Sequence, residues 1–152
     1  MQLWTFLHIL AMFVAVSVAL GGELFAIEAV RRRDVAALRS YFRVSDRLEG
    51  IGAVALLAGV AFGLLAAWVG GLNLLQGWLV LAYALVAGGV VVGIGTAPVL
   101  KRIREAVDAN PGDDAAPALD QLLASPLPYV LVGTSSLFLV VVLWVMVFKP
   151  SF

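Results

Sequence analysis

The chain alternates long apolar stretches with short polar segments, and four of the stretches are long enough to cross a membrane. They cover about residues 3–30, 50–70, 77–100 and 126–148. An α-helix needs about 20 apolar residues to cross roughly 30 Å of hydrocarbon. A membrane β-barrel would instead show many segments of about ten residues with alternating polarity, and the sequence has none. The pattern predicts an all-α membrane protein, with four transmembrane helices in one antiparallel bundle and a single membrane domain over residues 1–152.

Composition supports this prediction. Of the 152 residues, 62% are hydrophobic and 13% are charged, whereas a soluble domain has about 45–50% apolar and about 25% charged residues. The lipid bilayer is therefore the main partner, and the formal net charge of +0 suggests no nucleic-acid partner. Cysteine is absent, which excludes disulfides, thiolate metal sites and covalent attachment of heme. No basic residue precedes the first apolar stretch, so we expect a retained helix and not a cleaved signal peptide.

The basic residues predict the orientation. Nine of the ten lysines and arginines lie in two segments, 31–49 and 101–125, which we expect to be cytoplasmic loops by the positive-inside rule. Met1, the turn at 70–73 and Phe152 then face the other side, so the chain is N-out and C-out in the bacterial cytoplasmic (inner) membrane as a multi-pass protein. Four tryptophans fall near the outer boundary as an interfacial belt: Trp4, Trp68, Trp78 and Trp144.

Each predicted loop has its own pattern. In the first, Asp34 can cap a short helix in which Val35, Leu38 and Phe42 recur at helical spacing, which predicts a helix lying on the inner leaflet. This segment is either a site for anionic lipids or a partner, or a topology determinant with arginines that reach toward the headgroups. The second loop predicts a solvated turn followed by a brief helix at residues 119–123.

Small residues predict how the helices associate. Gly59 and Gly63 form a G-x-x-x-G pair in the second stretch, and Gly89 and Gly93 form another in the third. Lipid supplies no hydrophobic force between helices, so close approach at small residues is what holds them together. We expect tight helix contacts at both pairs, and a protein that is a homo-oligomer or a subunit of a larger membrane complex.

The first stretch alone carries ionisable groups within its apolar run: His8, Glu23 and Glu28. An ion pair with the arginines at positions 31 and 32 accounts for Glu28. Glu23 lies about 12 Å of helix rise from Arg31, at a depth where a charge costs about 2.5–3.5 kcal/mol, so we expect this intramembrane carboxyl to face the bundle, to be protonated or to find a partner. The available partners are inward-reaching arginines or one of four hydroxyls: Ser17, Thr134, Ser135 and Ser136.

His8 shares one face of the first helix with Glu23 and with a row of small residues. At 100° per residue that face holds His8, Met12, Ala15, Ala19, Gly22, Glu23 and Ala26. The small residues either let another helix approach, with His8 hydrogen-bonded at the interface, or leave room for a flat cofactor. In the second case neutral His8 would be an axial ligand of heme b, and Met12 would line the pocket. A lone histidine leaves the other face of the iron to a second copy or another ligand.

Five short segments in this order resemble a bacterial family of predicted integral membrane proteins of unknown function: FLHIL (6–10), DRLEG (46–50), GWL (77–79), PVLKRI (98–103) and VFKP (147–150). The resemblance covers nearly the whole chain and implies a four-helix inner-membrane protein without an assigned reaction. The Leu-His-Ile opening is also distantly similar to the membrane-bound four-helix protoporphyrinogen oxidase and to copper-resistance membrane domains. The first of these similarities implies a heme at His8.

Three functional hypotheses follow. The first is a non-catalytic structural or accessory four-helix module, since no residue pattern demands an enzyme, a catalytic residue or a metal site beyond heme iron. The second is a heme b protein in electron transfer or tetrapyrrole oxidation, with His8 as ligand. The third is a proton-coupled or small-solute carrier that uses Glu23, although the sequence shows no inverted repeat.

Overall fold

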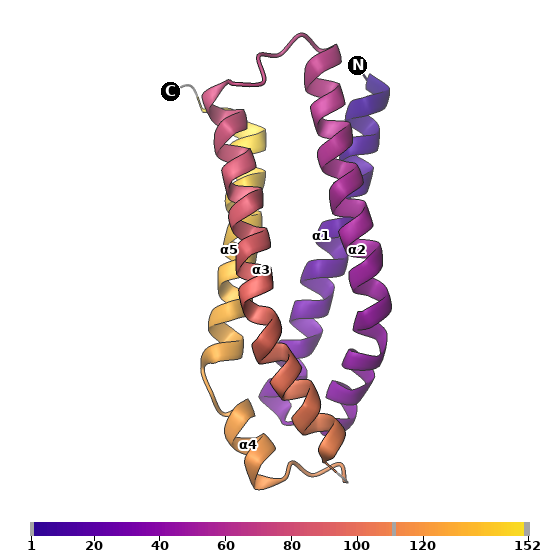
Figure 1. Ribbon diagram of the computed structural model, residues 1–152, viewed down its shortest axis with the longest axis vertical. Coiled ribbons are helices and arrows are strands. Elements are labelled where there is room, and N and C mark those ends of the chain that lie inside the picture. Colours follow the sequence, from indigo (N-terminus) through magenta and orange to yellow (C-terminus); the bar gives the residue numbers. More distant parts are fainter. Residues whose placement is uncertain (1, 111, 151–152) are drawn as a thin grey trace.

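The computed structural model describes residues 2–110 and 112–150 and contains five helices (Figure 1). Their order is α1 (Gln2–Arg32), α2 (Val35–Val69), α3 (Gly77–Ala109), α4 (Pro117–Leu123) and α5 (Leu127–Phe148). Four of them are long and apolar enough to cross a membrane, and no strand occurs in the described ranges, so the predicted all-α class with four spans is confirmed. Met1, Pro111, Ser151 and Phe152 lie outside the described residues, as do the predictions made for Met1 and Phe152.

The four long helices form two antiparallel hairpins. In Figure 1, α1 and α2 run side by side, and α3 runs beside α5, with both described chain ends at the same end of the molecule. We call α1 with α2 the first hairpin and α3 with α5 the second hairpin. The end with the arginines of residues 31–47 and 101–104 is the basic end, and the opposite end is the terminal end.

The turn between α1 and α2 is tight. Arg33 takes a left-handed conformation with φ of +54°, and Asp34 then caps α2 by accepting a hydrogen bond from the Ala37 N–H at 2.8 Å. This confirms the predicted cap, because a carboxylate at this position satisfies an N–H group that has no partner inside the helix. Residues 35–49 are therefore helical and continuous with the membrane span, where a separate loop was expected.

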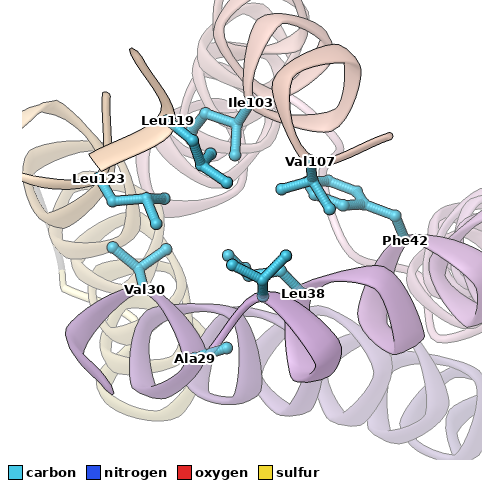
Figure 2. Packing of buried hydrophobic residues seen from close by; sticks show 9 residues of the cluster. Ala29, Val30, Leu38, Phe42, Ile103, Val107, Leu119 and Leu123 are labelled. Atoms are coloured by element: carbon cyan, nitrogen blue, oxygen red, sulfur yellow. The ribbon is translucent and has the colours of Figure 1, made fainter. Parts of the chain in front are cut away.

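The expectation of a helix lying on the inner leaflet is wrong. Val35, Leu38 and Phe42 belong to the first turns of α2 and are covered by protein. They pack in a cluster to which α1, α3 and α4 also contribute (Figure 2). We call this set the basic-end cluster: Ala29, Val30, Val35, Leu38, Phe42, Ile103, Val107, Leu119 and Leu123.

Helix α4 completes the basic end. The predicted brief helix at 119–123 is confirmed, and it begins two residues earlier, at Pro117. Leu119 and Leu123 are each 2% exposed and point into the basic-end cluster (Figure 2). α3 runs through Pro98 as far as Ala109, so the predicted second loop is reduced to residues 110–116 and the turn before α5.

Ion pairs tie the elements together at the basic end. Arg33 reaches Asp120 of α4 at 2.6 Å, and Arg104 of α3 binds both carboxylate oxygens of Asp46 at 2.7 and 2.8 Å. The Arg104 guanidinium lowers the pKa of Asp46, a group beyond the apolar part of α2. Arg39 donates to the backbone carbonyls in the turn after α3. Several of the arginines that suggested a lipid or partner site are thus paired within the chain.

Aromatic residues gather at the terminal end. Trp4 begins α1, Trp68 ends α2, Trp78 begins α3 and Trp144 lies in the last turns of α5. The Nζ of Lys149 lies 5.5 Å from the Trp78 ring centroid, within range of a cation–π contact. The predicted belt of tryptophans therefore forms at one end of the bundle.

Candidate ligand-binding cavity

A cavity of about 760 Å³ opens along α1 and α2, and the second hairpin borders it at Gly93, Leu100 and Leu139. A second cavity of about 340 Å³ adjoins it. The two share lining residues from all four long helices, among them Met12, Leu56, Gly93 and Leu139. The smaller cavity therefore lies between the hairpins, and the larger one continues from it along the first hairpin.

The lining is mostly apolar, and its few polar residues carry carboxyl or hydroxyl groups. The larger cavity is lined by the carboxyls of Glu23 and Glu49, and Glu23 also lines the smaller one. Hydroxyl groups make up the rest of the polar lining: Ser40, Tyr41, Ser45, Thr96 and Ser135. Among the described residues that line either cavity, none is a lysine, arginine or histidine.

Glu23 joins the two hairpins. Ser135 of α5 lies with its Oγ 2.5 Å from Glu23 Oε1, and the Oγ of Ser136 lies 3.4 Å from Oε2. Both serines are among the hydroxyls that the sequence offers as partners. The Ser135 Oγ also lies 3.1 Å from the Leu131 carbonyl, so its proton has a second acceptor. The Ser135 hydroxyl can thus donate to the Glu23 carboxyl while it also lies near a backbone carbonyl of its own helix.

His8 lies in the contact between α1 and α2. Its Nδ1 is 2.7 Å from the Gly59 carbonyl oxygen, and since a carbonyl only accepts, Nδ1 carries the proton. A Cβ at Gly63 would lie 2.9 Å from the same Nδ1, and a Cβ at Gly59 would lie 2.6 Å from the Met12 sulfur. The first G-x-x-x-G pair therefore receives the side chains of His8 and Met12, and the predicted close contact forms there.

The second glycine pair behaves differently. No atom lies within 4 Å of a Cβ built at Gly89 or Gly93, and both glycines line the smaller cavity. The tight contact expected at this pair is absent within the described chain, because α3 faces the space between the hairpins at these positions. The same motif thus packs a helix in one hairpin and borders a cavity in the other.

These positions bear on the heme hypothesis. Met12 lines both cavities, but His8 lines neither, so a heme in the cavity would lack its histidine ligand. The donor set around the cavity therefore does not fit a heme. Among the described residues, no group of three histidines, aspartates or glutamates is placed to hold a metal ion.

The small face of α1 divides into two parts. His8 and Met12 contact the glycines of α2, whereas Ala19, Gly22, Glu23 and Ala26 line the cavities. The packing interpretation therefore holds near the terminal end, and the rest of the face borders the two cavities. The sequence did not single out Tyr41 or Glu49, because both lie in the segment that was expected to be a loop.

The comparison with protein families agrees with an integral membrane protein. Residues 2–150 match the family described as predicted integral membrane protein (DUF2269). No curated protein and no solved structure matches the chain, so the similarities to the oxidase and to copper-resistance domains gain no support. Nearly the full length is matched, and the chain therefore belongs to the DUF2269 family of predicted integral membrane proteins.

Proposed function

We propose that this protein is an accessory, non-enzymatic four-helix module that holds a small membrane-soluble molecule between its two hairpins. The observation that supports this proposal is the pair of adjoining apolar cavities, of about 760 and about 340 Å³, whose volumes fall within the range of about 300–1,000 Å³ typical of small-molecule sites.

The proposal is tested by filling the cavity. Ala19 lines both cavities, and Ala19→Trp places an indole in the space where the molecule would lie. Leu24→Trp is the matched control, because Leu24 is on the same helix, is 63% exposed and lines neither cavity. Native mass spectrometry of protein released from mild detergent should show a one-to-one adduct with the wild type and Leu24→Trp, but not with Ala19→Trp. An adduct of equal abundance in the wild type and both variants, or no adduct in the wild type, contradicts the proposal.

We also propose that the module sits in the bacterial inner membrane with its basic end in the cytoplasm, as the positive-inside rule predicts. The absence of cysteine makes this directly testable. A membrane-impermeant maleimide added to intact spheroplasts should label Leu75→Cys, in the turn at the terminal end, and leave Asp114→Cys at the basic end unlabelled until the cells are opened. The reverse pattern overturns the orientation.

In this proposal the module works with other chains, as a homo-oligomer or as a subunit of a larger membrane complex. The support is that Gly95 and Gly133 line neither cavity and that no other helix of the described chain lies within 4 Å of a Cβ built at either position, which leaves both open to the close approach of a helix from another chain. The same native mass spectra report the subunit number. A single-chain mass both in detergent and in lipid nanodiscs would exclude a homo-oligomer.

Heme binding through His8 is the alternative, outside the cavities because His8 lines neither of them, and one observation favours it. Histidines that ligate metals commonly donate their other ring N–H to a carbonyl, as Nδ1 of His8 does to Gly59. An absorption spectrum of protein from cells supplied with a heme precursor tests it, in oxidised and dithionite-reduced states. A ligand-holding module as described above is colourless, whereas a Soret band that disappears in folded His8→Ala assigns the protein to the heme class.

A further inference from the structure

The ionisable groups around the cavity indicate what kind of molecule it holds. Of the side chains that line it, Glu23 and Glu49 are carboxyls, and no basic residue lines it in the described chain. This contrasts with the rest of the molecule, where ten basic residues balance ten acidic ones. We propose, on the basis of the proposed function, that the cavity binds an amphiphilic organic cation whose positive group lies against the Glu23 carboxylate.

Glu23 lies deep in the apolar part of α1. Its carboxyl lies eight residues before Arg31, about 12 Å along α1. Within the chain, hydroxyls of two α5 residues, Ser135 and Ser136, contact it. A carboxylate can accept about four hydrogen bonds, so part of its capacity is left for an occupant of the cavities that it lines. Hydroxyls alone do not neutralise the charge, and a bound cation does.

The apolar lining restricts the shape and polarity of the occupant. Leu56, Gly93, Leu100 and Leu139 line both cavities and offer an apolar surface from α2, α3 and α5. A molecule that fills this space must therefore be mostly hydrocarbon or aromatic, with its polar group confined to the neighbourhood of Glu23. A phospholipid with an anionic phosphate would bring like charges together near Glu23 and Glu49, which disfavours it.

The experiment uses two probes of equal shape and opposite charge. Tetraphenylphosphonium and tetraphenylborate are compared by equilibrium dialysis against the full chain in lipid nanodiscs, with empty nanodiscs subtracted. The cation should bind saturably at one site per chain, and the anion should show no saturable binding. Saturable binding of the anion with equal affinity would overturn the charge assignment.

Variants locate the site. Glu23→Gln keeps the size of the side chain and should weaken tetraphenylphosphonium binding at least tenfold, whereas Glu23→Asp, which keeps the charge, should weaken it less. Ala19→Trp should abolish binding, and its control Leu24→Trp should leave it unchanged. Unaltered binding in Glu23→Gln overturns the inference. Circular dichroism and gel filtration of each variant show that it is folded.

One further variant tests whether the Glu23 carboxylate binds the ligand or only holds the two hairpins together. Ser135→Ala removes the contact with α5 but keeps the carboxylate. If it binds tetraphenylphosphonium within about threefold of the wild type while Glu23→Gln does not, Glu23 acts on the ligand. An equal loss in the two variants assigns Glu23 a purely structural role and overturns the inference.

The inference and the proposed function fail in distinguishable ways. Mass spectrometry can show an adduct that is lost in Ala19→Trp, while tetraphenylphosphonium neither binds nor displaces that adduct. This result overturns the cationic ligand but leaves the ligand-holding module standing. If neither an adduct nor binding of tetraphenylphosphonium is found, both the inference and the proposed function are overturned. An adduct whose composition includes an amine or another fixed positive charge supports both.

Discussion

Replacing Gly63 with alanine tests whether the first hairpin depends on a position without a side chain. A Cβ at residue 63 would lie 2.9 Å from Nδ1 and 3.0 Å from Cε1 of His8. These atoms belong to a rigid ring whose Nδ1 donates to the Gly59 carbonyl at 2.7 Å. The ring cannot retreat without lengthening that hydrogen bond, so the substitution must push α1 away from α2 or break the bond.

The magnitude follows from three opposing contributions. Overpacking in a well-packed contact costs about 1–3 kcal/mol, and the lost hydrogen bond adds about 0.5–1.5 kcal/mol. Alanine in place of glycine inside a helix returns about 1 kcal/mol of helix propensity. Gly63→Ala should therefore lower the free energy of unfolding by about 2 kcal/mol.

Gly93→Ala is the matched control for this prediction. It is the same substitution in the other G-x-x-x-G pair, where no atom lies within 4 Å of the added Cβ. The helix-propensity gain then acts alone, and the free energy of unfolding should stay the same or rise by up to about 1 kcal/mol. Unfolding in mixed micelles, followed by circular dichroism against the mole fraction of dodecyl sulfate, measures both variants. Equal effects of the two substitutions, or a larger loss in Gly93→Ala, would refute the reasoning.

Two further predictions concern the basic end. Leu38→Ala truncates a side chain that is 1% exposed in the basic-end cluster and should cost about 2–5 kcal/mol in the same unfolding assay, whereas Leu122→Ala on α4, 38% exposed, should cost less than about 1 kcal/mol. Arg104 lowers the pKa of Asp46, so the pair stabilises the fold above the ordinary aspartate pKa of about 3.9 and loses this effect as pH falls through the lowered value. The difference in Tm between the wild type and Asp46→Asn should shrink below about pH 4; a constant difference at every pH would contradict it.

Much of the fold could be predicted because it depends on local composition. Apolar stretches of about 20 residues mark the four spans, and Asp34 caps α2 where the sequence placed a cap. The helices extend further than the apolar stretches because hydropathy reports contact with lipid and not the length of a helix. Val35, Leu38 and Phe42 keep a helical apolar spacing beyond the hydrocarbon, and α3 and α4 cover them.

The candidate site could be predicted only in part. The depth of Glu23 required a partner, and the hydroxyls of Ser135 and Ser136 supply it. The cavity itself depends on how one hairpin lies against the other, which no periodicity encodes. The same glycine spacing has two outcomes. Gly59 lies in close contact with Met12, whereas no side chain of another helix lies within 4 Å of a Cβ built at Gly93.

The central claim is that a small molecule lies between the two hairpins, and photocrosslinking in living cells tests it most directly. A benzophenone amino acid at Leu56 of α2 and at Leu139 of α5 would face the cavity, whereas the neighbouring positions Leu57 and Val140 are 71% and 62% exposed. The account predicts the same single adduct mass at positions 56 and 139 and its absence at 57 and 140. Bulk phospholipid adducts at all four positions alike, or no adduct from the cavity positions, would contradict it.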